Sequence, residues 1–449
     1  MLVLVFVTLL AAVLISRRGA STPGFLLGAA SLLISPSLSE AQYQAVGFLL
    51  IGVAFLLAAT KRTLRLSPGV VAIMGVFAAL HFLPVVVTLV SLGYAPEGEL
   101  YSAAIAFALA VAVTPILSDR DYSYAAAKLF VTANVLMAAS ALATLVLNRT
   151  LGIGTRYEFG NPLSNYGTPV PLDFPLTTSL GSTQFFIAAF GEIDRWTGLA
   201  REPGMAAVYC LISLIIVQSV RNFPFRWTST IVLALGVLGT GSTSGILIFF
   251  VVVILILAYG AVRNYPLYRF LLSLCIVSGL FVFSAAVLSF ARGVIEEKEQ
   301  RDSVSYSDRM ADVESGLQAL EQSPWLGIGL DGQSFSLIGG IAKWGLGYPI
   351  LVAVFISLVV RVTWPNRAVA IGGGGLFLVF LTTQPALGSF AAFVMMGAVA
   401  GLLQREVEVD GASPLNGRAS SSSLAKMLES KGRPNRLPFL LPPVDKALE

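Results

Sequence analysis

The sequence has few charged residues, a single histidine and only two cysteines among its 449 residues. Charged residues make up 12% of the chain, whereas soluble proteins carry about 25%. So few ionic groups could not cover a water-soluble globule, which excludes a cytosolic enzyme, a nucleic-acid-binding domain and a secreted disulfide scaffold. Cys210 and Cys275 both lie in apolar runs, so neither a disulfide framework nor a thiolate metal site is expected.

Apolar sequence is what the chain has in abundance, with 56% hydrophobic residues and a mean hydropathy of +0.80. A bilayer core about 30 Å thick needs about 20 apolar residues in a helix, because no backbone polar group can stay unpaired in lipid. We therefore expect an all-α fold, a polytopic transmembrane bundle of about 12–14 spans with two long outer loops. The candidate spans lie near 1–16, 21–36, 41–60, 70–92, 100–117, 125–147, 204–220, 228–242, 245–260, 270–290, 337–360, 368–383 and 386–403.

Lysine and arginine in the short loops predict the direction in which the helices cross the membrane. Alternate short loops carry these residues, whereas the loops between them, near 37–40, 93–99, 240–245 and 384–388, carry none. Because cytoplasmic loops are enriched in Lys and Arg, the alternation places the N-terminus outside and the C-terminus in the cytoplasm. The run 1–16 is then a retained anchor rather than a signal peptide, since its arginines follow it.

This topology divides the chain into six segments. They are N-terminal transmembrane helices at 1–147, a first outer loop at 148–203, central transmembrane helices at 204–290, a second outer loop with an amphipathic helix at 291–336, C-terminal transmembrane helices at 337–404, and a disordered cytoplasmic tail at 405–449. The first outer loop is rich in Gly, Pro, Asn and Thr, which predicts turns rather than helix over most of its length.

The first outer loop ends in a charged stretch directly before an apolar span. Arg195, Arg201 and Glu202 therefore fall at the outer membrane–water boundary, where the next helix starts. Backbone N–H groups at a helix start favour anions, and arginine offers a forked, permanently charged donor for phosphate oxygens. Spacing alone leaves two interpretations open: an anion site, or arginines that anchor the span against lipid headgroups.

The second outer loop is highly charged, since residues 291–335 hold thirteen of the fifty-four charged residues of the chain. Ser305–Asp308 has the pattern of a capping box that opens a helix, and Pro324 ends that helix. Its apolar face would consist of Met310, Val313, Leu317 and Leu320. Such an amphipathic helix would lie on the membrane surface and hold Arg309 near the boundary, although a solvated structural helix fits the same pattern.

Three features together resemble the O-antigen ligase and polymerase superfamily of bacterial membrane glycosyltransferases. They are the Arg195-x-x-Gly198-x-x-Arg201-Glu202-Pro203-Gly204 stretch, the Ser/Thr turn from Gly239 to Gly245, and Arg309 with a helix ending in Pro324-Trp325-Leu326-Gly327-Ile328-Gly329. The resemblance covers about residues 190–360. It implies inverting, metal-independent transfer of a glycan from a polyprenyl-pyrophosphate donor to an acceptor sugar, on the periplasmic face of the bacterial inner membrane.

The resemblance also assigns roles to residues. Arg195, Arg201 and Arg309 match the motif positions and would bind the pyrophosphate, while Glu202 is either the general base or the residue that holds Arg201 in place. The predicted substrate-binding residues are Asp308, Trp325 and Lys343. No cofactor is implied. The expected partners are the polyprenyl-pyrophosphate-linked donor and acceptor and membrane lipids, a chain-length regulator stays open, and no nucleic acid is expected.

The position of the single histidine bears on the choice of reaction. Ligases of this superfamily often carry a histidine soon after the Gly-x-Gly turn of the second loop, but residues 335–341 contain none. His81 lies inside an apolar span instead, where a packing role is the simpler interpretation. The sequence therefore favours a polymerase, with a ligase as the alternative. A flippase or other transporter of lipid-linked sugars is a further alternative, but it would place charges within the spans.

Three other patterns have simpler explanations than catalysis. Asp119-Arg120-Asp121 imitates a metal-binding motif but falls on the predicted cytoplasmic side, which indicates a solvated turn. Glu97-Gly98-Glu99 lies outside and could hold a divalent ion, which is a weak sign of a metal-dependent transferase. The glycine run 372–375 lacks the residues of a phosphate-binding loop and is typical of close helix packing.

Overall fold

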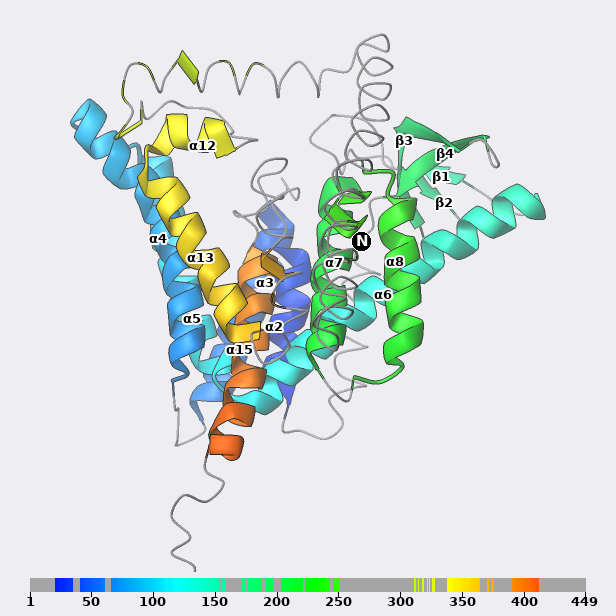
Figure 1. Ribbon diagram of the computed structural model, residues 1–449, viewed down its shortest axis with the longest axis horizontal. Coiled ribbons are helices and arrows are strands. Elements are labelled where there is room, and N and C mark those ends of the chain that lie inside the picture. Colours follow the sequence, from blue (N-terminus) through cyan, green and yellow to red (C-terminus); the bar gives the residue numbers. More distant parts are fainter. Residues whose placement is uncertain are drawn as a thin grey trace, which may run out of the picture. The chain divides into compact units, whose positions relative to one another are not determined.

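The computed structural model shows a mostly helical chain (Figure 1). The residues that it describes are 21–34, 41–60, 66–152, 156–158, 171–173, 177–187, 191–196, 203–220, 223–242, 245–246, 248–250, 253, 311, 314, 317–318, 321, 323, 325–327, 337–363, 370, 373–374 and 390–411. Internal contacts divide the chain into two units, 1–404 and 405–449.

Most of the described residues belong to apolar helices. The helices are α2 (Thr22–Leu33), α3 (Ala41–Ala59), α4 (Pro68–Leu92), α5 (Glu97–Leu117), α6 (Arg120–Thr150), α7 (Pro203–Ser219), α8 (Arg226–Gly239), α12 (Leu337–Trp344), α13 (Gly347–Thr363) and α15 (Phe390–Gly411). Three of them, α4, α5 and α6, are long and apolar enough to cross a membrane, and shorter apolar helices coincide with other predicted spans. The predicted spans 1–16 and 270–290 lie outside the described residues, and 245–260 and 368–383 are described only in part.

Local sequence explains where several helices begin and end. Helix α4 starts with Pro68 in its first turn and stops at Gly93, whose φ of 77° suits a residue without a side chain. Asp119 precedes α6 as its N-cap, and its carboxylate accepts hydrogen bonds from the N–H groups of Asp121 and Tyr122. At 31 residues, α6 spans about 46 Å and is longer than a bilayer core, so it must tilt or extend beyond the membrane.

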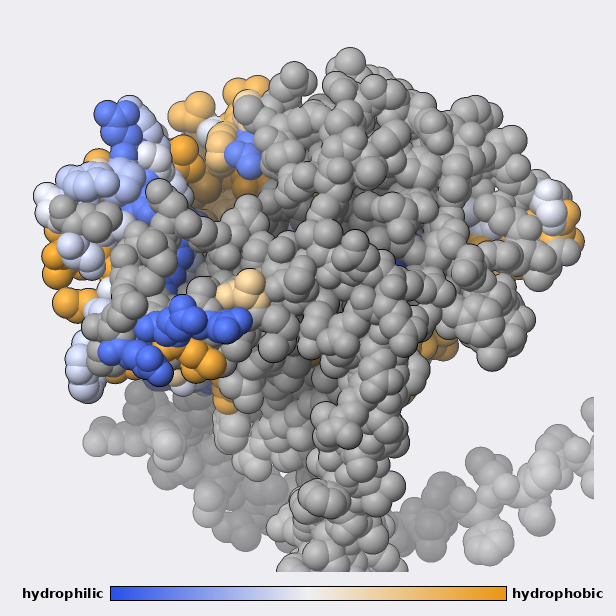
Figure 2. Space-filling model, turned by 90° about the horizontal axis from the view of Figure 1, so that it is seen from above, coloured by the Kyte–Doolittle hydropathy of each residue, from blue (hydrophilic) through white to orange (hydrophobic). Residues whose placement is uncertain are grey.

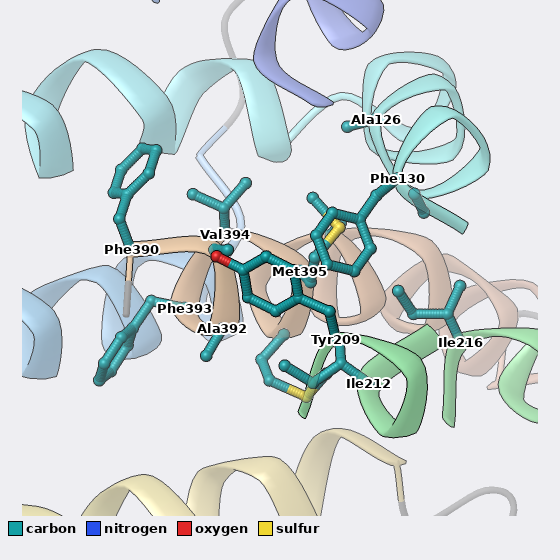
Figure 3. Packing of buried hydrophobic residues seen from close by; sticks show 14 of the residues in the cluster. Ala126, Phe130, Tyr209, Ile212, Ile216, Phe390, Ala392, Phe393, Val394 and Met395 are labelled. Atoms are coloured by element: carbon teal, nitrogen blue, oxygen red, sulfur yellow. The ribbon is translucent and has the colours of Figure 1, made fainter. Parts of the chain in front are cut away.

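Helices α7 and α15 form the centre of the bundle. Nearly every described side chain of α7 is buried, as are residues 390–402 of α15, which is typical of helices that are apolar on all faces. Phe393 of α15 packs against Phe77 of α4. Figure 3 shows Tyr209 of α7 packed against Phe130 of α6. This core holds α7, which starts directly after the predicted catalytic stretch, between the neighbouring helices.

Large hydrophobic side chains are exposed on the surfaces of α3, α4 and α5, which is typical of helices that contact lipid. They include Leu49, Leu56, Val86, Leu89, Val90, Ile105 and Phe107. In Figure 2 the hydrophobic atoms on the described surface include a group at the left edge, where Figure 1 has α4 and α5. An apolar surface of this extent would be unstable in water, so it supports a location in a membrane.

The segment predicted to be the first outer loop contains an antiparallel sheet, so the predicted all-α fold is incomplete. Its strands are β1 (Arg156–Glu158), β2 (Pro171–Asp173), β3 (Thr177–Ile187) and β4 (Gly191–Trp196), paired in that order. The register joins Phe186 to Glu192 and Ser179 to Trp196. The prediction counted threonine with Gly, Pro and Asn as a sign of turns, whereas the threonines and aromatic residues of β3 favour strands.

The predicted span 337–360 is broken into two helices, α12 and α13. Gly345 adopts a φ of 64° and its N–H group donates to the carbonyl of Ile341, which ends α12. Helix α13 then starts at Gly347, and Figure 1 shows α12 running across the end of α13 rather than continuing it. Helix α15 reaches Gly411, so residues 405–411, predicted to be part of a disordered tail, are helical; the rest of the tail lies outside the described residues.

Candidate active site

Strand β4 is attached to one end of α8 by two consecutive side chains. The indole N–H of Trp196 donates to the carbonyl oxygen of Gly236 at 3.0 Å, and Trp196 is 5% exposed. Nε of Arg195 donates to the carbonyl oxygen of Thr240 at 3.3 Å. Because Gly236 and Thr240 are one helical turn apart, these two bonds hold the end of β4 along the last turn of α8.

The turn that follows α8 is buried and held by its own side chains. Thr240 donates its hydroxyl to the carbonyl of Val237 and accepts the N–H of Ser242. Ser242 accepts the N–H of Gly245 with its hydroxyl, and its carbonyl accepts the N–H of Ile246. Ser242 thus acts as the N-cap of the helical residues that follow. In the part of the Ser/Thr turn that the structure describes, side-chain hydrogen bonds of Thr240 and Ser242 therefore link the end of α8 to the helical residues that follow.

Electrostatics favour the guanidinium group at this position. The carbonyl groups at the C-terminal end of a helix carry a partial negative charge, and they attract a cation within the last turn. Arg195 is half-buried and directs Nε toward that end of α8. A guanidinium is planar and has donors on three nitrogens, so the bond from Nε to Thr240 orients the plane of the group.

A second attachment joins the end of the second outer loop to the junction between α12 and α13. The N–H of Leu346 donates to the carbonyl oxygen of Trp325 at 3.1 Å. Gly327 and Gly345 have φ values of 72° and 64°, and their backbones touch so closely that a side chain on either would overlap the other segment. Backbone packing thus requires Gly327 of the motif and Gly345 at the end of α12.

The side chains at this second attachment include two predicted substrate-binding residues. Trp325 exposes 73% of its surface, so its ring contributes little to the contact between the Gly327 and Gly345 backbones. Lys343 is half-buried, with Nζ lying 5.5 Å from the centroid of the Trp344 ring. Trp344 in turn packs against Tyr348 of α13 with ring centroids 5.0 Å apart. Lys343 is therefore held close to the motif segment that carries Trp325.

The structure brings together some of the predicted residues and leaves others undescribed. Arg195 meets the Ser/Thr turn, and Trp325 meets the segment that contains Lys343. Arg201, Glu202, Asp308 and Arg309 lie outside the described residues. In the predicted amphipathic helix the described positions are helical and exposed; they are Ala311, Glu314, Leu317, Gln318 and Glu321. Leu317, predicted on the apolar face, is 51% exposed.

The carboxylates set aside in the sequence have structural roles. Asp119 caps α6 rather than pairing with Asp121 around an ion. Glu99 accepts a hydrogen bond at 2.9 Å from the hydroxyl of Thr88, which links the first turn of α5 to α4. Across the described ranges, no group of three or more His, Cys, Asp and Glu side chains could hold a metal ion.

The lone histidine and the glycine run also have packing roles. Nδ1 of His81 lies 2.9 Å from the carbonyl oxygen of Phe77, and the two rings are 4.5 Å apart. Gly373 faces side chains of α13 and α7, and Gly374 faces Val360 of α13, so a larger residue at Gly374 would crowd that helix. Both features agree with the interpretations drawn from the sequence.

Sequence reasoning missed Trp196 and Thr240 as individual residues. Trp196 stands at an unspecified position of the arginine motif, and Thr240 was considered only as part of the turn. A buried tryptophan usually finds an acceptor for its N–H, and the glycines Gly236 and Gly239, three residues apart, mark a helix face open to a large ring. Together these two signals could have predicted the contact.

Comparison with known families adds a finding that agrees with this geometry. The model of the O-antigen ligase family matches residues 228–349. The resemblance to the O-antigen ligase and polymerase superfamily is confirmed. The matched segment includes most of α8, the Ser/Thr turn, the second outer loop and α12, and Arg195 of β4 contacts it at Thr240. A search of the curated proteins finds no match. The family implies a membrane enzyme that transfers glycosyl groups and takes lipid-linked glycans.

Proposed function

We propose that this protein is a polysaccharide polymerase of the bacterial inner membrane. It would join glycan repeat units carried on polyprenyl pyrophosphate, on the periplasmic face, and make an O-antigen or exopolysaccharide. The observation that carries the proposal is the hydrogen bond from Arg195 to Thr240, because it brings the arginine motif of the first loop onto the segment that matches the family model.

The proposed chemistry needs a group that stabilises a departing anion. The hydroxyl oxygen of the acceptor sugar attacks the anomeric carbon of the donor, and the bond between that carbon and the pyrophosphate oxygen breaks. Its electron pair stays on the lipid pyrophosphate, and the acceptor proton passes to a base. Donors placed where charge develops lower the barrier, and arginines bind phosphate oxygens with two parallel hydrogen bonds.

The predicted residues divide these tasks. Arg195, Arg201 and Arg309 would bind the pyrophosphate, with Asp308, Trp325 and Lys343 contacting the rest of the substrate. Glu202 would either accept the proton or hold Arg201 in place. The fixed plane of the Arg195 guanidinium supports its part in this arrangement, since a donor already oriented needs no reorganisation as charge develops.

Two alternatives remain as outcomes of the test. A ligase would transfer a finished glycan to lipid A-core; the packing of His81 within α4 and the lack of a histidine among residues 335–341 of the sequence favour the polymerase. A transporter or flippase would carry lipid-linked sugars across the membrane and would show no change in bond formation when the arginines are replaced.

The test compares glycan lengths made by cells that carry Arg201→Ala, Arg309→Ala or a control. Arg361→Ala is the matched control, because Arg361 is an exposed arginine in the last turn of α13, away from the motifs. We expect both motif variants to lose long-chain product while the protein stays in the membrane, and the control to keep it.

The pattern of the remaining product distinguishes the activities. One repeat unit left on lipid A indicates that polymerisation is lost, and no repeat unit on lipid A indicates that ligation is lost. Retention of normal chain length in both arginine variants would overturn the proposal. Accumulation of unpolymerised repeat units on the cytoplasmic leaflet would point to the transporter.

A further inference from the structure

We propose that Trp196 is a positioning residue, which holds Arg195 in the orientation needed for pyrophosphate departure; this inference rests on the proposed function. Trp196 is adjacent to Arg195 in the chain and ends strand β4. Its ring is buried while Arg195 is half-buried, so the tryptophan can fix the backbone from which the arginine side chain extends.

The indole occupies a space that small residues leave open on α8. Gly236 and Gly239 both face the ring: a Cβ atom on Gly239 would lie 3.2 Å from the indole Nε1, and one on Gly236 would lie 3.6 Å from Cζ2. Ala138 of α6 and Cys210 of α7 lie near Gly236 as well. The ring is therefore set among three helices, and its position depends on the absence of side chains on α8.

The hydrogen bond of the indole selects one position within this space. The carbonyl of Gly236 accepts the indole N–H at 3.0 Å and also the N–H of Thr240 at 3.1 Å. The same acceptor thus couples Trp196 to the residue whose carbonyl receives Arg195. A shift of the indole would move the end of β4, and with it the anchor of the guanidinium relative to Thr240.

Two variants test the position and the hydrogen bond separately. Trp196→Phe keeps an aromatic ring and removes the N–H donor, whereas Gly239→Ala keeps the donor and pushes the ring by a few tenths of an ångström. Matched controls are Trp227→Phe, because Trp227 is 79% exposed at the other end of α8, and Gly52→Ala, because Gly52 of α3 has open space around it.

Activity is measured on the full-length protein in detergent micelles, with a polyprenyl-pyrophosphate-linked repeat unit as the probe. We expect Trp196→Phe and Gly239→Ala each to lower kcat about 3- to 10-fold, as expected for loss of one hydrogen bond or a small misplacement. KM should change less than twofold, and both controls should keep the wild-type kcat.

A double-mutant cycle separates positioning from general support of the fold. If Trp196 acts through Arg195, Trp196→Phe should have no further effect on kcat in an Arg195→Ala protein. An additional 3- to 10-fold loss in that background would overturn the inference and leave the proposed function intact. If Arg195→Ala alone keeps full activity, Arg195 has no catalytic role in the proposed function. The positioning role of Trp196 is then overturned as well, because it acts through Arg195.

Discussion

The two long loops, both predicted to lie outside the membrane, are attached to the helices by different chemical means. At the first attachment, Arg195 and Trp196 of β4 donate side-chain hydrogen bonds to backbone carbonyls at the end of α8. At the second, the backbones of Gly327 and Gly345 meet directly, and the N–H of Leu346 donates to the carbonyl of Trp325. The first attachment depends on the side chains of Arg195 and Trp196, whereas the second depends on two glycines, whose lack of a side chain lets the backbones meet.

This difference indicates how each attachment can be disrupted. The first attachment uses the indole N–H of Trp196 and Nε of Arg195. The second is a contact between backbones, and the side chain of Trp325 stays 73% exposed beside it. We infer that removing a side chain disrupts the first attachment, whereas adding a side chain disrupts the second.

The largest effect is expected at the first attachment. Replacing Arg195 by alanine should lower kcat about 10²- to 10³-fold, the usual loss when one donor to a developing anion is removed. Arg195→Lys keeps the charge without the forked geometry and should recover only part of the rate. Turnover of a lipid-linked repeat unit measures both variants. Equal rates for lysine and arginine would mean that charge alone matters and that the contact with Thr240 does not.

A smaller effect, on stability rather than rate, is expected at the second attachment. Gly345→Ala and Gly327→Ala force a side chain into a positive-φ conformation, which costs about 1–3 kcal/mol, and into a close backbone contact. Both should lower the midpoint of thermal unfolding in detergent, while Gly52→Ala serves as the control. Unchanged midpoints would show that the two segments do not pack as described.

The smallest effect on stability is expected for Trp325. Because its side chain is 73% exposed, Trp325→Ala should change the free energy of unfolding by less than about 0.5 kcal/mol. If the ring contacts the substrate, KM for the lipid-linked donor should rise while the unfolding midpoint stays constant. Loss of stability without a change in KM would instead assign Trp325 to packing and reduce the contrast between the two attachments.

The helices were predictable because their cause is local. A run of about 20 apolar residues must be helical in a bilayer, and signals such as Pro68, Gly93 and the cap at Asp119 mark where helices begin and end. The break at Gly345 was missed, although Lys343, Gly347 and Pro349 interrupt the apolar run around it. The contact with Gly327 that accompanies the break joins separate segments and has no local signal.

The sequence predicted which residues belong to the candidate site better than it predicted which of them are in contact. The motifs named Arg195 and the Ser/Thr turn, but only the folded chain shows that the guanidinium donates to Thr240. The strands were not predicted because the threonines of the loop were counted with its Gly, Pro and Asn residues as a sign of turns, although threonine and phenylalanine in β3 favour a strand. The contact of Trp196 with Gly236 joins residues forty positions apart, and only the tryptophan itself and the spacing of Gly236 and Gly239 hint at it in the sequence.

The central claim is that guanidinium groups at this end of α8 bind the pyrophosphate of a lipid carrier. The most direct measurement is the affinity of the purified, full-length protein for a short-chain polyprenyl pyrophosphate in micelles, by titration calorimetry, with the corresponding monophosphate for comparison. The account predicts that the pyrophosphate binds more tightly and that Arg195→Ala and Arg201→Ala each weaken its binding at least tenfold, while Arg361→Ala does not. Equal affinity of all four proteins for the pyrophosphate would contradict the claim.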